Sequence, residues 1–95
     1  MSEWTFEFED YEYKINPRSI EFVGELDEER YVFCVLASTL NDYFETNDDR
    51  ESAINNYLEN MDNIHSVAES VASEYDPNEE TPDYYIDEED LAEFC

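Results

Sequence analysis

Carboxylates are the most abundant groups in this chain that could take part in chemistry. Its 95 residues include 28 Asp and Glu but only 4 Lys and Arg, which gives a formal net charge of -24. Paired carboxylates can act as general acid and base, but here the pairs are surface neighbours. No glycine-rich phosphate loop and no Ser/His or Cys/His combination accompanies them. We therefore expect no enzymatic activity, and we look for the function in the charge itself.

The sequence also lacks the patterns of a metal site. His65 is the single histidine, and no other ligand follows it at zinc-site spacing. No EF-hand ladder of carboxylates surrounds Gly24, the one glycine. Cys34 lies in an apolar run and Cys95 is the last residue, a pair that does not amount to a disulfide framework. We expect no cofactor and no dedicated metal site.

The sign of the charge limits the partners. Such an acidic surface repels nucleic acid and anionic membranes, and the chain has no signal-peptide pattern and no apolar run of about 18 residues. Size scaling predicts about one net negative charge per 240 Å² of folded surface, whereas a DNA duplex carries about one per 110 Å². Carboxylates gathered on half of the surface would match DNA. We expect a cytoplasmic protein whose partner is basic.

Hydrophobic patterning predicts strands in the first 37 residues. Apolar and polar residues alternate over 3–9 and again over 11–15, and we expect these strands to form a hairpin around Asp10. A third strand is predicted at 19–23. Residues 30–37 are almost continuously apolar, as in a central strand with neighbours on both sides. Together they predict an antiparallel sheet of three or four strands.

Residues 48–75 carry the pattern of a long amphipathic helix, with Asn47 or Asp48 as the expected N-cap. An unbroken helix of that length would span about 42 Å, more than the roughly 32 Å expected for the whole domain, so we expect a break within 60–63. A short helix over 39–44, capped by Ser38, is predicted to precede it. The apolar stripe consists of Ile54, Leu58, Met61, Ile64, Ala68, Val71 and Tyr75.

The C-terminal segment, residues 74–95, combines dense charge with residues that can dock on a core. Ten of the twenty residues from 74 to 93 are acidic and none is basic. We expect 84–86 to be extended and 87–94 to form a short helix that starts with a capping box. The whole chain is thus predicted to be one α+β domain: a small antiparallel sheet packed against a long, broken helix plus short helices.

The predicted partner-binding surface is assembled from three acidic groups and two tyrosines. Carboxylates two apart on a strand or three to four apart on a helix stand about 5 to 7 Å from each other, which is similar to the separation of successive phosphates. The first strands contribute Glu7, Glu9 and Glu12, the long helix contributes Glu59, Asp62 and Glu69, and the C-terminal segment contributes Glu79, Glu80, Asp83, Tyr84, Tyr85, Asp87, Glu88, Glu89 and Asp90.

One stretch resembles a known family. Residues 82–92, PDYYIDEEDLA, are similar to the "YIDYE" segment of plasmid-borne and transposon-borne antirestriction proteins. Glu88 stands where that family usually has tyrosine, and Glu93 where it has arginine. Residues 30–38 resemble the family's opening strand, although the Asn-Asn-Gly that follows there is missing. The matching positions in the first stretch are Tyr85, Ile86, Asp87, Glu89, Leu91 and Ala92.

That resemblance implies a DNA mimic. The family imitates bent DNA and occupies type I restriction enzymes, and the chain as a whole resembles small acidic phage proteins of the antirestriction and anti-CRISPR type. The implied partner is a basic DNA-binding protein or nuclease complex in the host cytoplasm. Two alternatives stay open: an acidic adaptor that binds a histone-like protein or transcription factor, and a housekeeping protein of a salt-loving organism. The oligomeric state, a homodimer included, also stays open.

Overall fold

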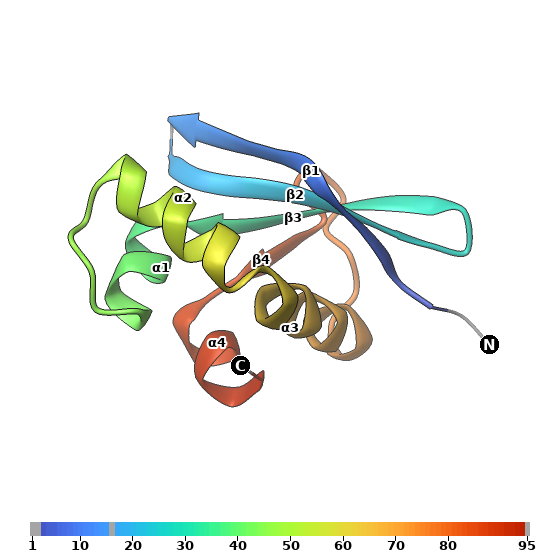
Figure 1. Ribbon diagram of the computed structural model, residues 1–95. Coiled ribbons are helices and arrows are strands. Elements are labelled where there is room, and N and C mark those ends of the chain that lie inside the picture. The colour runs from blue at the N-terminus through green and yellow to red at the C-terminus, as the bar shows by residue number, and fades with distance from the viewer. Residues whose placement is uncertain (1–2, 16, 95) are drawn as a thin grey trace.

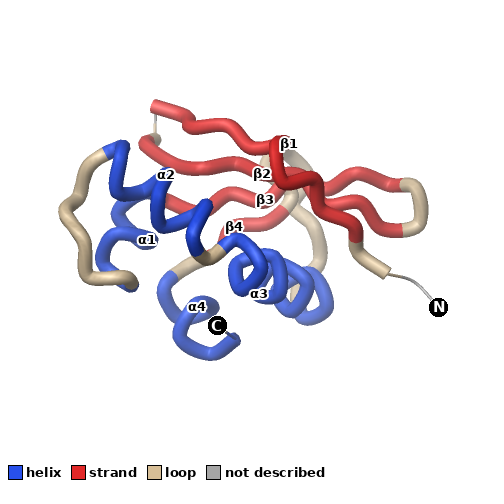
Figure 2. The backbone as a smooth tube through the Cα atoms, viewed as in Figure 1, coloured by secondary structure: helices blue, strands red, loops and turns tan. Residues whose placement is uncertain are grey.

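A computed structural model describes residues 3–15 and 17–94, leaving aside the side chains of 7–10 and 94. A four-stranded sheet carries helices packed on one side of it (Figures 1 and 2). The predicted α+β class is confirmed. The elements in chain order are β1 (Thr5–Ile15), β2 (Arg18–Leu26), β3 (Glu29–Leu36), α1 (Ala37–Tyr43), α2 (Arg50–Glu59), α3 (Met61–Glu74), β4 (Tyr84–Ile86) and α4 (Glu88–Phe94).

The sheet is mixed, with strand order β1-β2-β3-β4. β1, β2 and β3 pair antiparallel as predicted, whereas β4 pairs parallel to β3, with Cys34 opposite Tyr85. β3 is therefore the central strand that its continuous apolar run indicated. The expectation of a purely antiparallel sheet is wrong, because the extended residues 84–86 join this sheet after the helices have crossed over it.

β1 is one strand, so the predicted hairpin around Asp10 is wrong. Phe6 lies opposite Gly24 and Tyr11 lies opposite Phe22, which means that β1 advances five residues while β2 advances two. Such a bulge changes the phase of the alternation within one strand. The apolar positions change from even to odd residue numbers after Asp10 because of this bulge, and not because of a turn. It keeps both aromatic rings on the side of the sheet that faces the helices.

The core lies between this side of the sheet and the helices, and it is rich in aromatic rings. Phe22 and Phe33 stack with ring centroids 5.4 Å apart. Gly24 makes room for the start of β1, because a Cβ atom there would lie 2.5 Å from Cε1 of Phe6 and 3.0 Å from Cε3 of Trp4. The core residues are Ile20, Phe22, Phe33, Val35, Ala37, Leu40, Ala53, Tyr57, Ile64, Val67, Ala68, Val71, Tyr84, Ile86 and Leu91.

The long helical region breaks at Asn60, within the predicted range. Asn60 Nδ2 donates a hydrogen bond to the carbonyl oxygen of Asn56 and so covers the end of α2. The break changes the buried face: α2 buries Ala53, Asn56 and Tyr57, while Leu58 is 42% exposed. The continuous apolar stripe expected across both helices is therefore correct for α3 but wrongly phased for α2.

Helix capping differs from two sequence-based expectations. The N-cap of α2 is Asp49, whose Oδ1 accepts a hydrogen bond from the amide of Ser52 at 2.7 Å. Asp48, one of the two expected caps, instead accepts a hydrogen bond from Nδ2 of Asn41. Ser38 does not cap α1, because the chain passes directly from β3 into the helix after Leu36. In both cases the tertiary path of the chain fixes the helix start.

Candidate partner-binding surface

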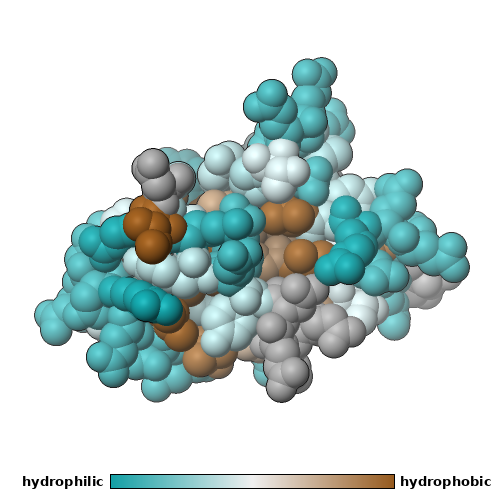
Figure 3. Space-filling view, turned by 90° about the horizontal axis from the view of Figure 1, so that it is seen from above, coloured by the Kyte–Doolittle hydropathy of each residue, from teal (hydrophilic) through white to brown (hydrophobic). Residues whose placement is uncertain are grey.

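Negative charge covers the surface but positive charge is confined to one part of the sequence. Residues 51–95 contain fourteen Asp and Glu and no Lys or Arg. Two of the four cations lie beside Tyr13. Arg18 Nε donates a hydrogen bond to the Tyr13 hydroxyl at 3.2 Å, and the Arg50 guanidinium lies 5.3 Å from the centre of the Tyr13 ring. The helices that follow residue 50, with β4, therefore form a region without a counter-charge. Figure 3 shows hydrophilic side chains around small apolar areas on the face seen from above.

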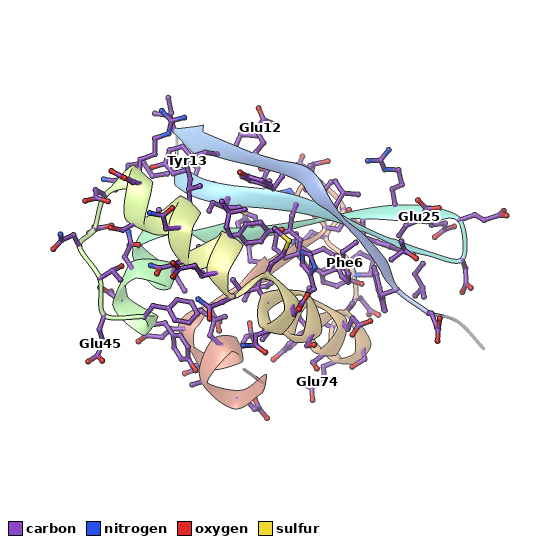
Figure 4. The ribbon with its side chains drawn as sticks, in the orientation of Figure 1. Phe6, Glu12, Tyr13, Glu25, Glu45 and Glu74 are labelled. Carbon is purple, nitrogen blue, oxygen red and sulfur yellow. The ribbon has the colours of Figure 1, made fainter. Side chains whose placement is uncertain are left out.

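Glu12, the member of the first predicted group whose side chain is described, does not join the other acidic groups. Glu12 is exposed and pairs with Lys14 at 3.3 Å. It lies opposite Glu21, on the face of the sheet away from the core, and it points away from the helices in Figure 4. The side chains of Glu7 and Glu9 lie outside the described residues. The fold thus separates Glu12 from the acidic groups of the helices.

The second group lies at and beyond the helix break. Glu59 ends α2 and Asp62 is in the first turn of α3, so both stand beside Asn60. They are exposed and line a hollow of about 550 Å³ together with Leu58 and Met61. Glu69 is half-buried farther along α3. The structure therefore brings Glu59 and Asp62 together and leaves Glu69 apart.

Asp83 and Tyr84, both of the third group, stabilise the fold. Oδ2 of Asp83 accepts a hydrogen bond from the amide of Val32 at 2.8 Å, which ties the start of β4 to β3. Tyr84 is buried, and its ring stacks on Phe33 with centroids 5.2 Å apart. The structure buries most of the Tyr84 side chain in the core, because inward-facing residues of β4 point there, although Tyr84 also belongs to the lining of a hollow beside β4. Tyr85, the next residue, is 54% exposed.

Asp87 and Asp90 form the predicted capping box. Asp87 Oδ1 accepts a hydrogen bond from the amide of Asp90 at 2.9 Å, and Asp90 Oδ2 accepts one from the amide of Asp87 at 3.1 Å. Asp90 is only 8% exposed, and burial, together with the nearby charge of Asp87, raises the pKa of its carboxyl group. Asp90 therefore stabilises the start of α4, and it also belongs to the lining of the hollow beside β4. Asp87 stays exposed.

Tyr85 and Asp87 of the third group belong to the lining of the same hollow, which the sequence did not reveal. The hollow has a volume of about 420 Å³, and its lining includes Tyr75, Asp76, Tyr85 and Asp87. The apolar stripe predicted from the sequence includes Tyr75, but this residue follows the last residue of α3 and is 57% exposed. Glu79, Glu80, Glu88 and Glu89 are exposed in the same C-terminal segment.

Carboxylates near Tyr75 affect the pKa of its phenol. The pKa of its phenol is raised, first by the charge of Asp90 and also by Glu74, Asp87 and Glu93. The pKa of Tyr84 is raised mainly by burial, with contributions from Asp83 and Asp76. These shifts place the end of α3, the loop after it and α4 in one negative field. The sequence could not indicate this, because the residues are separated along the chain.

Comparison with known proteins does not assign the chain to a group: no family model, no curated protein and no solved structure matches it. Among the described residues, no helix is long and apolar enough to cross a membrane. Within the same residues, no group of three or more His, Cys, Asp or Glu side chains is arranged to hold a metal ion.

Proposed function

We propose that this protein is a DNA mimic that inhibits a nucleic-acid-binding defence enzyme, a restriction or CRISPR nuclease, by occupying its basic groove. The observation that carries the proposal is the match between net charge and molecular length. The protein measures 39 × 25 × 23 Å. A duplex segment 39 Å long carries about 23 phosphate charges, at one per 1.7 Å, on a cylinder roughly 20 Å across. The chain carries a net charge of -24 over the same length.

The charge is also available to a partner. With four cations against 28 acids, one-to-one pairing leaves 24 carboxylates uncompensated. Asp90 is the one buried carboxylate among the described side chains. Exposed carboxylates on α2, α3 and the C-terminal segment take the place of phosphates, and their field steers a basic groove toward the protein. Inhibition by occupation needs no catalytic group.

The choice of a defence nuclease as target is supported by the resemblance in residues 82–92. Three of the residues that carry that resemblance, Tyr85, Asp87 and Glu89, are exposed in this structure. They lie in the region of the chain that has no cation, which suits contact with a basic groove. The proposed site of action is the cytoplasm of a bacterial host.

A competition experiment tests the proposal. Capture from bacterial lysate at low salt, with elution between about 0.2 and 0.5 M salt, identifies the target, because screening lengths fall well below 10 Å in that range. In a gel shift, the protein is expected to displace labelled duplex DNA from the captured enzyme, and the inhibition is expected to weaken steeply with salt. A 24-residue polyglutamate is the matched control for charge without shape, and it is expected to compete far less well. An enzyme that binds DNA and this protein simultaneously would replace the proposal with the adaptor alternative.

A further inference from the structure

The lining of the hollow beside β4 contains two exposed tyrosines together with carboxylates. Tyr75 and Tyr85 are both more than half exposed and line it from different elements, the end of α3 and the outer side of β4. Asp76 and Asp87 are exposed in the same lining. A tyrosine ring attracts a cation to its face, and carboxylates attract the same group by charge and by hydrogen bonds.

The end of α3 adds a further attraction for a cation. The C-terminal end of a helix carries a partial negative charge and carbonyl groups without intrahelical donors. The last turn of α3 contains no basic residue, and Tyr75 is its C-cap. The four carboxylates that raise the pKa of Tyr75 belong to this end of α3 and to the segment of Asp87, Asp90 and Glu93. Helix end and side chains thus favour the same kind of ligand.

Hydrogen bonds fix the loop between α3 and β4, which contributes Asn78 and Asp83 to the lining of the hollow. The amide of Asn78 donates to the carbonyl oxygen of Asp83 at 2.8 Å, and its side-chain Nδ2 donates to the carbonyl oxygen of Pro82 at 3.2 Å. Asp83 is in turn bound to the amide of Val32. A site fixed in this way loses little conformational freedom on binding.

We propose that this hollow receives an arginine side chain of the partner protein. A guanidinium group is planar, stacks on aromatic rings and presents five donors to surrounding carboxylates, whereas a lysine ammonium is compact and more strongly hydrated. The lining of the hollow contains both tyrosines and carboxylates. A bare metal ion does not fit as well, because the described residues provide no cluster of three or more ligands for one. The inference rests on the proposed function only in assigning the arginine to a DNA-binding groove.

The test uses the full chain and two peptides of equal charge. Blocked tetra-arginine and tetra-lysine are titrated into the ¹⁵N-labelled protein at low salt, and amide shifts are followed by NMR. Tetra-arginine is expected to bind at least about fivefold more tightly than tetra-lysine, with the largest shifts in residues 75–78 and 83–90. Equal affinities, or shifts spread evenly over the acidic surface, would overturn the inference in favour of diffuse charge attraction.

Variants separate the aromatic rings from the charge. Tyr75→Ala with Tyr85→Ala is expected to weaken tetra-arginine binding about five- to thirtyfold and to remove the preference over tetra-lysine. Tyr75→Phe with Tyr85→Phe keeps both rings and is expected to bind like the wild type. Leu58→Ala is the control for loss of an exposed apolar group near other carboxylates, and no change is expected. An alanine pair that binds unchanged would contradict the inference.

The two proposals can fail separately. The peptide titration contains neither DNA nor a nuclease, so its outcome does not depend on the competition gel shift. If tetra-arginine binds in the hollow but no DNA is displaced from a captured partner, the arginine site stands and DNA mimicry fails. If DNA is displaced but the peptides show no aromatic preference, mimicry stands and the arginine site fails. Were the alanine pair unfolded, the comparison of the two peptides on the wild type would still decide.

Discussion

The hydroxyl oxygen of Tyr57 lies 3.0 Å from Nε2 of His65, so a hydrogen bond joins α2 to α3 across the break at Asn60. The His65 ring also stacks on Phe6, with centroids 4.3 Å apart and planes 13° apart. Burial lowers the pKa of His65 from 6.5 to about 4, although the charge of Asp62 acts in the opposite direction. The folded protein therefore holds this imidazole neutral.

This neutral histidine predicts a loss of stability in acid. Below about pH 6.5 the unfolded chain takes up a proton that the folded protein does not accept until about pH 4. The contribution of His65 to the free energy of unfolding is thus complete above pH 6.5 and falls by about 3 kcal/mol toward pH 4. NMR titration of the single histidine is expected to give a midpoint near 4.

A variant isolates this effect from the protonation of carboxylates. His65→Phe lacks the titrating group. The free energy of unfolding of the wild type minus that of the variant is therefore expected to fall by about 3 kcal/mol from pH 7 to pH 4. A constant difference, or a histidine midpoint close to 6.5, would show that the imidazole is accessible to protons in the folded state.

The phase of the apolar stripe can be tested with two aspartate substitutions. Ile64→Asp is expected to lower the free energy of unfolding by about 3 kcal/mol or more, because the side chain is fully buried in the core and the new charge has no partner there. Leu58→Asp is expected to cost well under 1 kcal/mol, because Leu58 is largely exposed. Urea unfolding measures both, and similar losses for the two variants would contradict the change of buried face at Asn60.

Salt is expected to stabilise the protein. The 24 excess negative charges repel one another over a molecule 39 Å long, and the screening length falls from about 30 Å at 0.01 M to about 8 Å at 0.15 M salt. The melting temperature should therefore rise between these concentrations. A flat profile would mean that the carboxylates are spaced widely enough not to interact. A requirement for molar salt would favour the alternative of a protein from a salt-loving organism.

Substitutions at Asp83 test how much its hydrogen bond to the amide of Val32 contributes to stability. Asp83→Ala removes the acceptor for the amide of Val32 and is expected to destabilise the fold by about 1 to 2 kcal/mol. Asp83→Asn keeps an acceptor oxygen and removes the charge, so it is expected to retain most of the stability. Thermal unfolding of the two variants checks this difference. If both melt like the wild type, the hydrogen bond between β4 and β3 contributes little.

Charge reversal tests where the partner binds. Four reversals to lysine in the C-terminal segment are expected to abolish the displacement of DNA from a captured enzyme, while single reversals mainly slow association by modest factors. Four reversals elsewhere give the same net charge and are expected to leave most of the inhibition. The two sets are Glu79, Glu80, Glu88 and Glu89 for the test, and Glu25, Glu28, Asp42 and Glu45 for the control, all of them exposed. Equal loss in both sets would show that total charge, and not this surface, carries the inhibition.

Local sequence patterns sufficed for the elements whose causes are local. The α+β class, the central position of β3, the break near Asn60 and the short helix after Ile86 all follow from periodicity, length and capping signals within a few residues. The absence of Lys and Arg after Arg50 is likewise a property of the sequence. These features need no knowledge of which distant segments meet.

The tertiary structure decided the features that depend on contacts between residues far apart in the sequence. Two alternations of opposite phase describe either a hairpin or one bulged strand, and pairing with β2 selected the bulge. Tyr84 and Tyr85 are neighbours of one chemical type, yet parallel pairing with β3 turns the first into the core and the second to the surface. Tyr75 lies ten residues before Tyr85, and only the packing of the C-terminal segment against α3 places both in one hollow. Composition therefore determined the net charge, whereas contacts between distant segments determined which tyrosines and carboxylates lie together on the surface.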